Sequence, residues 1–191
     1  MVETRRQQIE DTASELFRER GYAATSVRDI ARAVSLQGGS LYAHVASKED
    51  VLWAIVVRAA GAFEAAAAAT TSDAAGPAAD RIRQLCRAHI RVLAADLGNA
   101  SVFLTEWRFL GEARRDQVRE MRDHYEGHFR ELIAQGAASG EFRSVDVALT
   151  STALLSTLNG VAIWYRPDGR LSPDEIADRY ADLFAKALEN R

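Results

Sequence analysis

Residues 25–49 read TSVRDIARAVSLQGGSLYAHVASKE, and this stretch decides the fold of the N-terminal part of the chain. Ser26, with Asp29 three residues later, is a helix start signal that predicts a second helix over Val27–Val34. Residues 35–37 interrupt that pattern, and a groove helix is expected over about Gly38–His44. Two short helices joined by a tight turn indicate a helix-turn-helix, whose second helix fits the major groove of DNA.

The sequence on either side of this stretch is also helical. A first helix containing Ile9 and Phe17 ends at Gly21, and Ser47 begins a long helix that reaches about Ala69. Three prolines and 12 glycines leave few breaks in the remainder. The sequence therefore predicts an all-α fold of about nine helices, with a three-helix unit at residues 1–47 and a helical body at residues 48–191. Helices of the body are expected from Pro77 to residues 97–99 and over residues 101–110, 112–138, 146–165 and 173–188.

The composition excludes several classes of protein. The chain has 191 residues, of which 48% are hydrophobic and 27% charged, with a net charge of −3, the balance of an ordinary globular protein. Its single cysteine, Cys86, excludes an internal disulfide framework and a cysteine-rich zinc site. The polar start and the lack of an apolar run near eighteen residues favour a cytoplasmic protein with no signal peptide and no membrane span.

Two segments of the N-terminal part resemble the TetR family of bacterial transcriptional regulators. They are FRERGYAATSVRDIA at residues 17–31 and LQGGSLYAHVASKE at residues 36–49. The chain departs from the family pattern in three places. Ser35 stands where the family usually turns with glycine, which costs about 1 kcal/mol if this residue is left-handed. Val45-Ala46 replaces the common Phe-Pro pair, and Gly38-Gly39 brings no side chain to the groove.

The resemblance implies roles for individual residues in DNA binding. Side chains of the groove helix would contact bases, whereas hydroxyls at helix starts, a lysine and the arginines before the first helix would contact the backbone. Each role has a structural alternative: Tyr42 could belong to the core, Ser26 could act only as a helix cap, and Arg5 and Arg6 could form a solvated terminus. The residues implied in DNA binding are Arg5, Arg6, Thr25, Ser26, Gln37, Gly38, Ser40, Tyr42, His44 and Lys48.

The last two helices are the candidate dimer interface. Residues 146–165 are apolar nearly all round, so this helix must be covered on every side, and residues 173–188 carry an apolar stripe. In the TetR family these two helices pair with their twofold mates as a four-helix bundle. The resemblance therefore implies a homodimer and a palindromic operator in double-stranded DNA. The alternative is that both helices only close the core of the monomer.

The resemblance also implies a small-molecule effector pocket between the long fourth helix and the fifth to eighth helices. Residues 106–126 and 159–169 are similar to a TetR branch that controls fatty-acid and steroid degradation and responds to acyl-coenzyme A. Arginines at positions 108, 114, 115, 119 and 122 would receive the phosphates of this effector, or would instead pair with neighbouring acidic residues. Candidate lining residues, of types that also fill ordinary cores, are Phe63, Cys86, His89, Phe103, Trp107, Met121, Tyr125, Phe129 and Asn159.

The sequence thus predicts a ligand-responsive repressor that is not an enzyme and that needs no cofactor, metal ion or membrane. Two rival classes remain open. His124 and His128 lie four residues apart with Glu120 and Glu131 near the same face, a spacing that binds zinc in some metal-dependent enzymes. The chain could also be a helical interaction module that does not bind DNA, because residues 38–39 and 45–46 depart from the motif.

Overall fold

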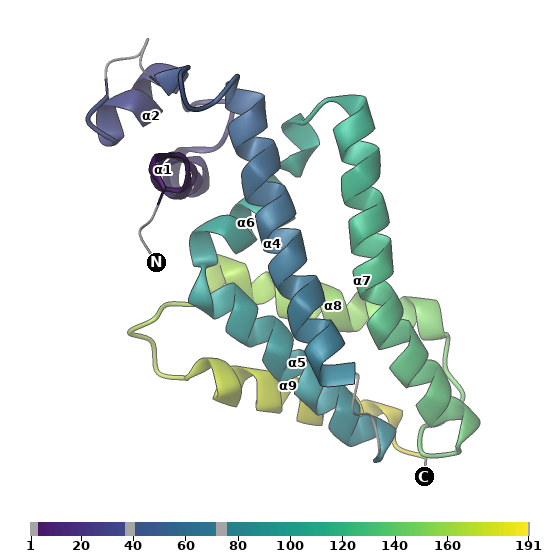
Figure 1. Cartoon of the computed structure of the whole chain (residues 1–191). Coiled ribbons are helices and arrows are strands. Elements are labelled where there is room, and N and C mark those ends of the chain that lie inside the picture. Colours follow the sequence, from purple (N-terminus) through teal and green to yellow (C-terminus); the bar gives the residue numbers. More distant parts are fainter. Residues whose placement is uncertain (1–3, 37–40, 72–75, 191) are drawn as a thin grey trace. The chain divides into compact units, whose positions relative to one another are not determined.

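The computed structural model describes residues 4–36, 41–71 and 76–190, and within these ranges the regular structure is helical with no strand. The all-α prediction is confirmed. The third predicted helix begins within residues 37–40, which lie outside the described residues. The elements shown in Figure 1 are α1 Arg5–Arg20, α2 Val27–Ala33, α4 Lys48–Thr71, α5 Ala78–Ala95, α6 Leu97–Thr105, the 3₁₀ helix η1 Trp107–Phe109, α7 Glu112–Ala138, α8 Val147–Trp164 and α9 Pro173–Leu188.

The helix starts follow the capping signals in the sequence. Ser26 accepts from the Asp29 backbone N–H at 3.2 Å while Asp29 accepts from the Ser26 N–H, a complete capping box for α2. Ser172 and Glu175 form the same box at the start of α9. These reciprocal bonds satisfy backbone donors that the first helical turn leaves without partners. The predicted starts of both helices are therefore confirmed.

One predicted boundary is wrong. The glycine and asparagine at residues 98–99 were expected to separate two helices, but α5 ends at Ala95 and α6 already begins at Leu97. Asp96 is the N-cap of α6, and its carboxylate accepts from the Asn99 backbone N–H at 3.0 Å. The two helices are therefore separated at Asp96, and Gly98 and Asn99 lie in the first turn of α6.

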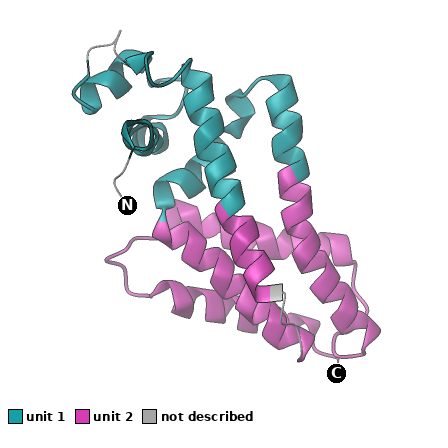
Figure 2. Cartoon of the chain, in the orientation of Figure 1, with its two compact units in different colours: residues 1–61, 96–120 teal, residues 62–95, 121–191 magenta. Residues whose placement is uncertain are grey.

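The chain divides into two compact units, which Figure 2 shows in different colours. Unit 1 comprises residues 1–61 and 96–120, and unit 2 comprises residues 62–95 and 121–191. The long helices α4 and α7 each contribute residues to both units. This division by packing does not coincide with the predicted division at residue 47, which concerns function and remains a prediction.

Unit 1 is built around the apolar face of α1. Ile9 and Phe17 are buried there, together with Ile30 of α2 and Leu52 of α4. Each fully buried side chain of this size contributes roughly 1.5–3 kcal/mol to folding. The Phe17 ring also makes an edge-to-face contact with Tyr22, with ring centroids 5.1 Å apart. The helix-turn-helix stretch therefore packs on the first half of α4, as its small size requires.

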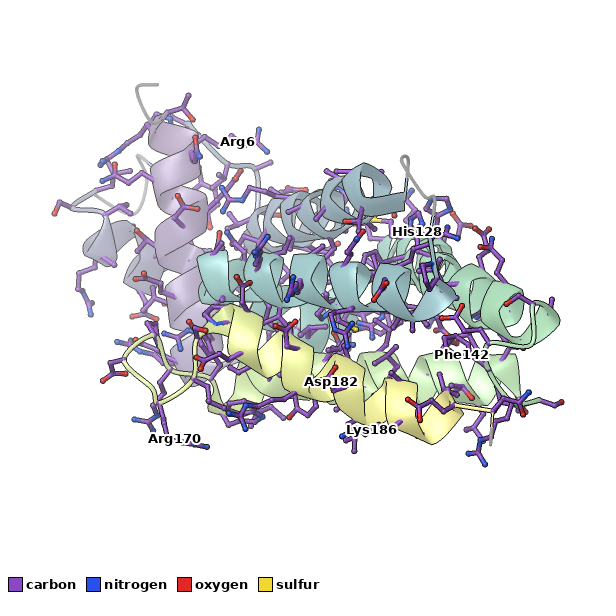
Figure 3. The ribbon with its side chains drawn as sticks, turned by 90° about the horizontal axis from the view of Figure 1, so that it is seen from below. Arg6, His128, Phe142, Arg170, Asp182 and Lys186 are labelled. Atoms are coloured by element: carbon purple, nitrogen blue, oxygen red, sulfur yellow. The ribbon has the colours of Figure 1, made fainter. Side chains whose placement is uncertain are left out.

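Unit 2 contains a ladder of ion pairs between α5 and α9, which lie side by side (Figure 1). Arg87 makes a bidentate contact with Asp178, at 2.6 and 2.8 Å, and Arg91 makes the same contact with Asp174. A third pair joins Arg83 to Asp182, which Figure 3 labels on α9. The pairs advance by four residues on each helix in opposite directions, so they fix the antiparallel register of α5 and α9. Exposed pairs of this kind add little stability individually.

Two helices have the length and composition of a membrane-spanning segment, residues 48–70 and Val147–Trp164. Neither segment is an uninterrupted apolar run, because Arg58 and Glu64 lie within the first and Ser151, Ser156 and Asn159 lie within the second. Core helices of globular proteins meet the same criteria. In α8 only 28% of this segment is buried within the chain, which leaves much of an apolar helix uncovered.

The end of α2 contains a strained residue. Ser35 has a φ of +55°, in the left-handed region, as the sequence predicts for a position where glycine is usual. The Leu36 N–H bonds to the Ala31 carbonyl at 2.8 Å and the Ser35 N–H to the Arg32 carbonyl at 3.1 Å, which is the Schellman arrangement of a helix end. A non-glycine residue in this conformation carries a steric cost of about 1–2 kcal/mol.

We therefore expect Ser35→Gly to stabilise the protein by about 1 kcal/mol, because glycine removes the clash and the Ser35 side chain is exposed and packs against little. Urea or thermal unfolding measures this change. Ser35→Ala keeps a Cβ and is the matched control, for which no gain is expected. Equal stability of Ser35→Gly and Ser35→Ala would show that the left-handed conformation does not cost the folded chain this energy.

Candidate DNA-binding and effector sites

The described part of the predicted groove helix contains both buried and exposed side chains. Leu41 is 1% exposed and Val45 is also buried, whereas Tyr42 is 56% exposed and His44 is exposed. The tyrosine is therefore available to a partner, and its assignment to the core is excluded. The other residues predicted to contact bases, Gln37, Gly38 and Ser40, lie outside the described residues.

Lys48 at the start of α4 already has partners within unit 1. Its ammonium donates to the carbonyl oxygens of Tyr22 at 2.9 Å and Thr25 at 2.8 Å, and it lies 4.0 Å from the centroid of the Tyr22 ring. Burial lowers the pKa of this amine. An ammonium has three N–H donors, so one remains for a DNA phosphate after these two bonds. Lys48 therefore bonds α4 to the loop before α2 within the protein itself.

The two hydroxyls predicted to meet phosphates have different surroundings. Thr25 is 1% exposed, and its hydroxyl donates to the Gly21 carbonyl at 2.9 Å. This geometry removes the Thr25 hydroxyl from the phosphate contacts that the resemblance implied, because burial and an internal acceptor occupy it. Ser26 is exposed, but its hydroxyl donates to Asp29, and this bond lowers the pKa of the aspartate. Ser26 therefore acts as a cap in this structure.

Arg5 and Arg6 were predicted to precede the first helix, but they are the first two residues of α1, and both have partners there. Arg5 donates to the Val34 carbonyl at 2.7 Å, which ties α1 to the end of α2. Arg6 pairs with Glu10 at 3.0 Å but keeps 61% of its side chain exposed. The sequence prediction missed Arg28 and Arg32, two exposed cations on α2. Their spacing of four residues places them on one helix face, a signal that was available in the sequence.

The arginine-rich start of α7 is engaged within unit 1. Arg114 donates to Glu49 at 2.9 Å and to Asp50, and its guanidinium lies 5.6 Å from the centroid of the Trp53 ring. These bonds raise the pKa of Arg114, and together with the Ser47 bond they lower that of Asp50. Because both carboxylates hold this guanidinium in place, Arg114 is not a free phosphate ligand. Its partners come from the start of α4, not from its own helix as the predicted alternative had it.

Seven of the candidate effector residues belong to unit 2, and five of these meet in one largely buried cluster. The His89 Nδ1 lies 3.0 Å from the Tyr125 hydroxyl. The Phe63 ring lies 4.8 Å from the His89 ring and 5.7 Å from the Tyr125 ring, between ring centroids. Phe129 packs on Tyr125 at 5.8 Å, and Asn159 interacts with His89. Residues from α4, α5, α7 and α8 thus assemble one aromatic and polar cluster.

Burial dominates the electrostatics of this cluster. It lowers the pKa of His89 to about 3, which the Asn159 interaction only partly offsets, so the imidazole is neutral at physiological pH. Burial also raises the pKa of Tyr125 and raises that of Cys86 to about 12, which leaves a neutral thiol without nucleophilic character. The His89 Nε2 is buried and has no hydrogen-bond partner of standard geometry within the part of the chain that the structure describes.

The neutral state of His89 makes stability depend on pH. The unfolded chain binds a proton at this residue below pH about 6.5, whereas the folded chain does so only near pH 3, so stability falls as pH drops between these values. The loss is about 1.4 kcal/mol per pH unit, or about 2 kcal/mol at pH 5. We expect His89→Gln to remove this part of the pH dependence in unfolding measurements, with the exposed His44→Gln as control. An unchanged slope in His89→Gln would contradict a buried neutral histidine.

The remaining effector candidates are distributed differently. Phe103 is buried in unit 1. Trp107 also belongs to unit 1, where the Arg119 guanidinium lies 5.9 Å from its ring centroid. Cys86 is fully buried and Met121 half-buried, both in unit 2. All nine candidate residues remain predictions as effector contacts.

The last two helices expose large apolar side chains. On α8, Ile163 is 89% exposed, Leu149 is 67% exposed and Trp164 is 47% exposed, and on α9, Leu183 is 60% exposed. A monomeric soluble protein seldom exposes so many large apolar residues on two adjacent helices. We call Leu149, Ile163, Trp164 and Leu183 the α8–α9 apolar surface.

An all-α fold, with Tyr42 exposed in a segment whose sequence predicts a helix-turn-helix, agrees with the class of helix-turn-helix transcription regulators. Comparison with known proteins places the chain within it. Residues 9–55 match the model of the bacterial regulatory proteins of the TetR family, and residues 75–188 match a tetracyclin repressor-like C-terminal domain. The chain belongs to the TetR family. Members of this family are regulators of transcription, and they bind operator DNA as homodimers.

Individual relatives agree with this assignment over nearly the whole chain. The transcriptional repressor KstR2 of Rhodococcus jostii is 28% identical over 96% of this chain and 91% of its own length. The crystal structure of PfmR from Thermus thermophilus superposes with a TM-score of 0.86 at 35% identity, over 95% of this chain and 99% of that one. AibR in complex with isovaleryl coenzyme A and operator DNA superposes with a TM-score of 0.85 at 28% identity, over 94% and 97%.

Proposed function

We propose that this protein is a cytoplasmic, homodimeric repressor that leaves a palindromic operator when a hydrophobic acyl-coenzyme A type effector binds to unit 2. Membership of the TetR family supports the regulator, and KstR2 supports repression. The AibR complex supports an acyl-coenzyme A as the effector class.

In the DNA-bound state, each subunit presents Tyr42 and His44 to the base edges of one half-site, with Arg28 and Arg32 of α2 near the phosphates. The exposure of these four side chains supports this assignment. A twofold dimer sets its two half-site contacts about 34–36 Å apart, one turn of DNA. The α8–α9 apolar surface supplies the dimer interface, because self-association buries side chains that one chain leaves in water.

The observation that carries the effector proposal is the buried His89 imidazole, whose Nε2 has no hydrogen bond of standard geometry although Asn159 interacts with this residue. If the Tyr125 hydroxyl donates to Nδ1, the neutral imidazole carries its proton on Nε2, which then needs an acceptor. Leaving such a donor buried and unsatisfied costs about 1–3 kcal/mol. The carbonyl oxygen of a thioester accepts this hydrogen bond, while Phe63 and Phe129 offer apolar surface to the acyl chain.

Effector binding reaches the DNA-binding end through α4. This helix is continuous from Lys48, which holds the loop before α2, to Phe63 in the cluster. An effector that displaces Phe63 favours a different position of α4 and of the loop that Lys48 holds. A coupling of about 1–3 kcal/mol weakens operator binding by about 5- to 150-fold.

Fluorescence anisotropy of an operator duplex, with isovaleryl-coenzyme A and longer acyl-coenzyme A esters as probes, tests this proposal. We expect at least one ester to release the wild-type protein from the operator. Release of the His89→Phe variant should need at least tenfold more of the same ester, while its DNA affinity without ester stays unchanged. Leu93→Met changes a buried residue of α5 at constant volume and is the matched control. Failure of all esters to release the wild type, or equal release of His89→Phe, would reject this effector site.

A further inference from the structure

Unit 2 contains a second cluster of polar side chains that neither DNA binding nor the effector proposal uses. The His128 Nε2 lies 2.9 Å from the Glu64 Oε1, and the His124 Nε2 lies 3.3 Å from the same oxygen. Glu64 comes from α4 and both histidines come from α7 (Figure 3 labels His128). One atom of each side chain lies within 4.8 Å of one atom of each of the others.

This cluster differs from the one that the sequence suggests. The histidine spacing of four residues places both rings on one face of α7, with ring centroids 5.6 Å apart. The carboxylate that meets them is Glu64, sixty residues away in the chain, in place of the predicted Glu120 and Glu131. The sequence therefore identified the two imidazoles and missed the third group, because only the packing of α4 on α7 within unit 2 supplies it.

The geometry of the three donors is close to that of a coordination site. Zinc bound at 2.0–2.1 Å in a tetrahedron has ligand atoms about 3.4 Å apart. The distances from the Glu64 Oε1 to the two Nε2 atoms, 2.9 and 3.3 Å, are near this value. In both imidazoles the Nε2 is the atom nearest to this oxygen. The His124 side chain is 71% exposed.

We propose that Glu64, His124 and His128 bind one divalent transition-metal ion per chain, with zinc as the best match. Two imidazoles and one carboxylate are a zinc donor set that leaves the fourth position open to water or a ligand. Imidazole nitrogen also favours zinc, cobalt and nickel over magnesium and calcium, which prefer oxygen donors. The ion links α4 to α7 within unit 2, one residue from Phe63 and from Tyr125 in sequence.

Metal binding to the full chain, purified without a histidine tag and treated with a chelator, tests this site. Titration with zinc chloride by calorimetry is expected to give one site per chain, and cobalt chloride is expected to give visible absorption of a tetrahedral ion without a thiolate band. Zinc is also expected to raise the thermal midpoint, because an ion that binds only the folded state stabilises it.

Variants separate this site from the other histidines and acids. His124→Ala, His128→Ala and Glu64→Gln are each expected to weaken zinc binding at least tenfold and to remove the rise in thermal midpoint. Glu131→Gln, an exposed acid on α7 outside the cluster, is the matched control and should bind as the wild type does. His124 is largely exposed, so His124→Ala tests the site even if the two more buried variants fold poorly. Absence of saturable binding, or wild-type binding by His124→Ala, would overturn the proposal.

Discussion

Tyr42→Ala is expected to weaken operator binding by about 30-fold or more. One specific base contact contributes about 1–3 kcal/mol, and a twofold dimer loses the same contact in both half-sites. The tyrosine is 56% exposed while its neighbour Leu41 is buried, so its removal takes a contact from the DNA and little from the core. Anisotropy at constant salt measures the change, because phosphate contacts make all such affinities depend on ionic strength.

The control variants for this prediction distinguish base contact from misfolding. Tyr42→Phe keeps the ring and loses only the hydroxyl, so it should retain part of the affinity if the ring packs against a base. The dependence of affinity on salt should stay unchanged in Tyr42→Ala, since no phosphate contact is removed. Operator affinity of Tyr42→Ala equal to that of the wild type, with the folded state confirmed by circular dichroism, would contradict the assignment of the groove helix.

Ile163→Glu is expected to convert the dimer to a monomer. Ile163 is 89% exposed on α8 in a single chain, so the substitution costs the monomer little. At a twofold interface the substitution occurs twice, and two carboxylates are brought into an apolar contact region. The dimer dissociation constant should rise by at least a hundredfold, and sedimentation should report the mass of one chain at micromolar concentration.

Val57→Glu is the matched control for this experiment. Val57 is also exposed, at 37%, and belongs to α4 in unit 1, away from the α8–α9 apolar surface in sequence. This variant should remain dimeric. A monomeric Val57→Glu together with a dimeric Ile163→Glu would place the interface elsewhere. Loss of the dimer in Ile163→Glu should also lower the operator affinity, because one subunit can occupy only one half-site.

Most helices could be predicted from the sequence because their signals are local. The capping boxes at Ser26 and Ser172 depend on residues three positions apart, and α7 has the predicted bounds 112–138. The strained turn at Ser35 was also predictable, from its place in the motif. The break between α5 and α6 was not, because Asp96 and the pair 98–99 offered competing signals and only the cap geometry decides between them.

The partners of charged side chains were the least predictable feature of the candidate sites. The sequence predicts phosphate contacts for Lys48 and Arg114, yet groups from other helices or loops within unit 1 hold both side chains. The contact between Glu64 and His128 is unpredictable from the sequence for the same reason. Such contacts join residues that are tens of positions apart, so no spacing rule in one sequence reports them. Aromatic residues were easier to place, since Phe63, Tyr125 and Phe129 lie together as their apolar character requires.

Selection of random DNA duplexes on the purified full chain tests most directly whether two subunits present Tyr42 to one operator. We expect enrichment of an inverted repeat whose half-site centres are about 10 base pairs apart, or a multiple of that spacing. Tyr42→Ala, selected in parallel, should fail to enrich this repeat. Enrichment of no sequence, of a single element without twofold symmetry, or of the same repeat by Tyr42→Ala would contradict binding of one operator by two subunits through Tyr42.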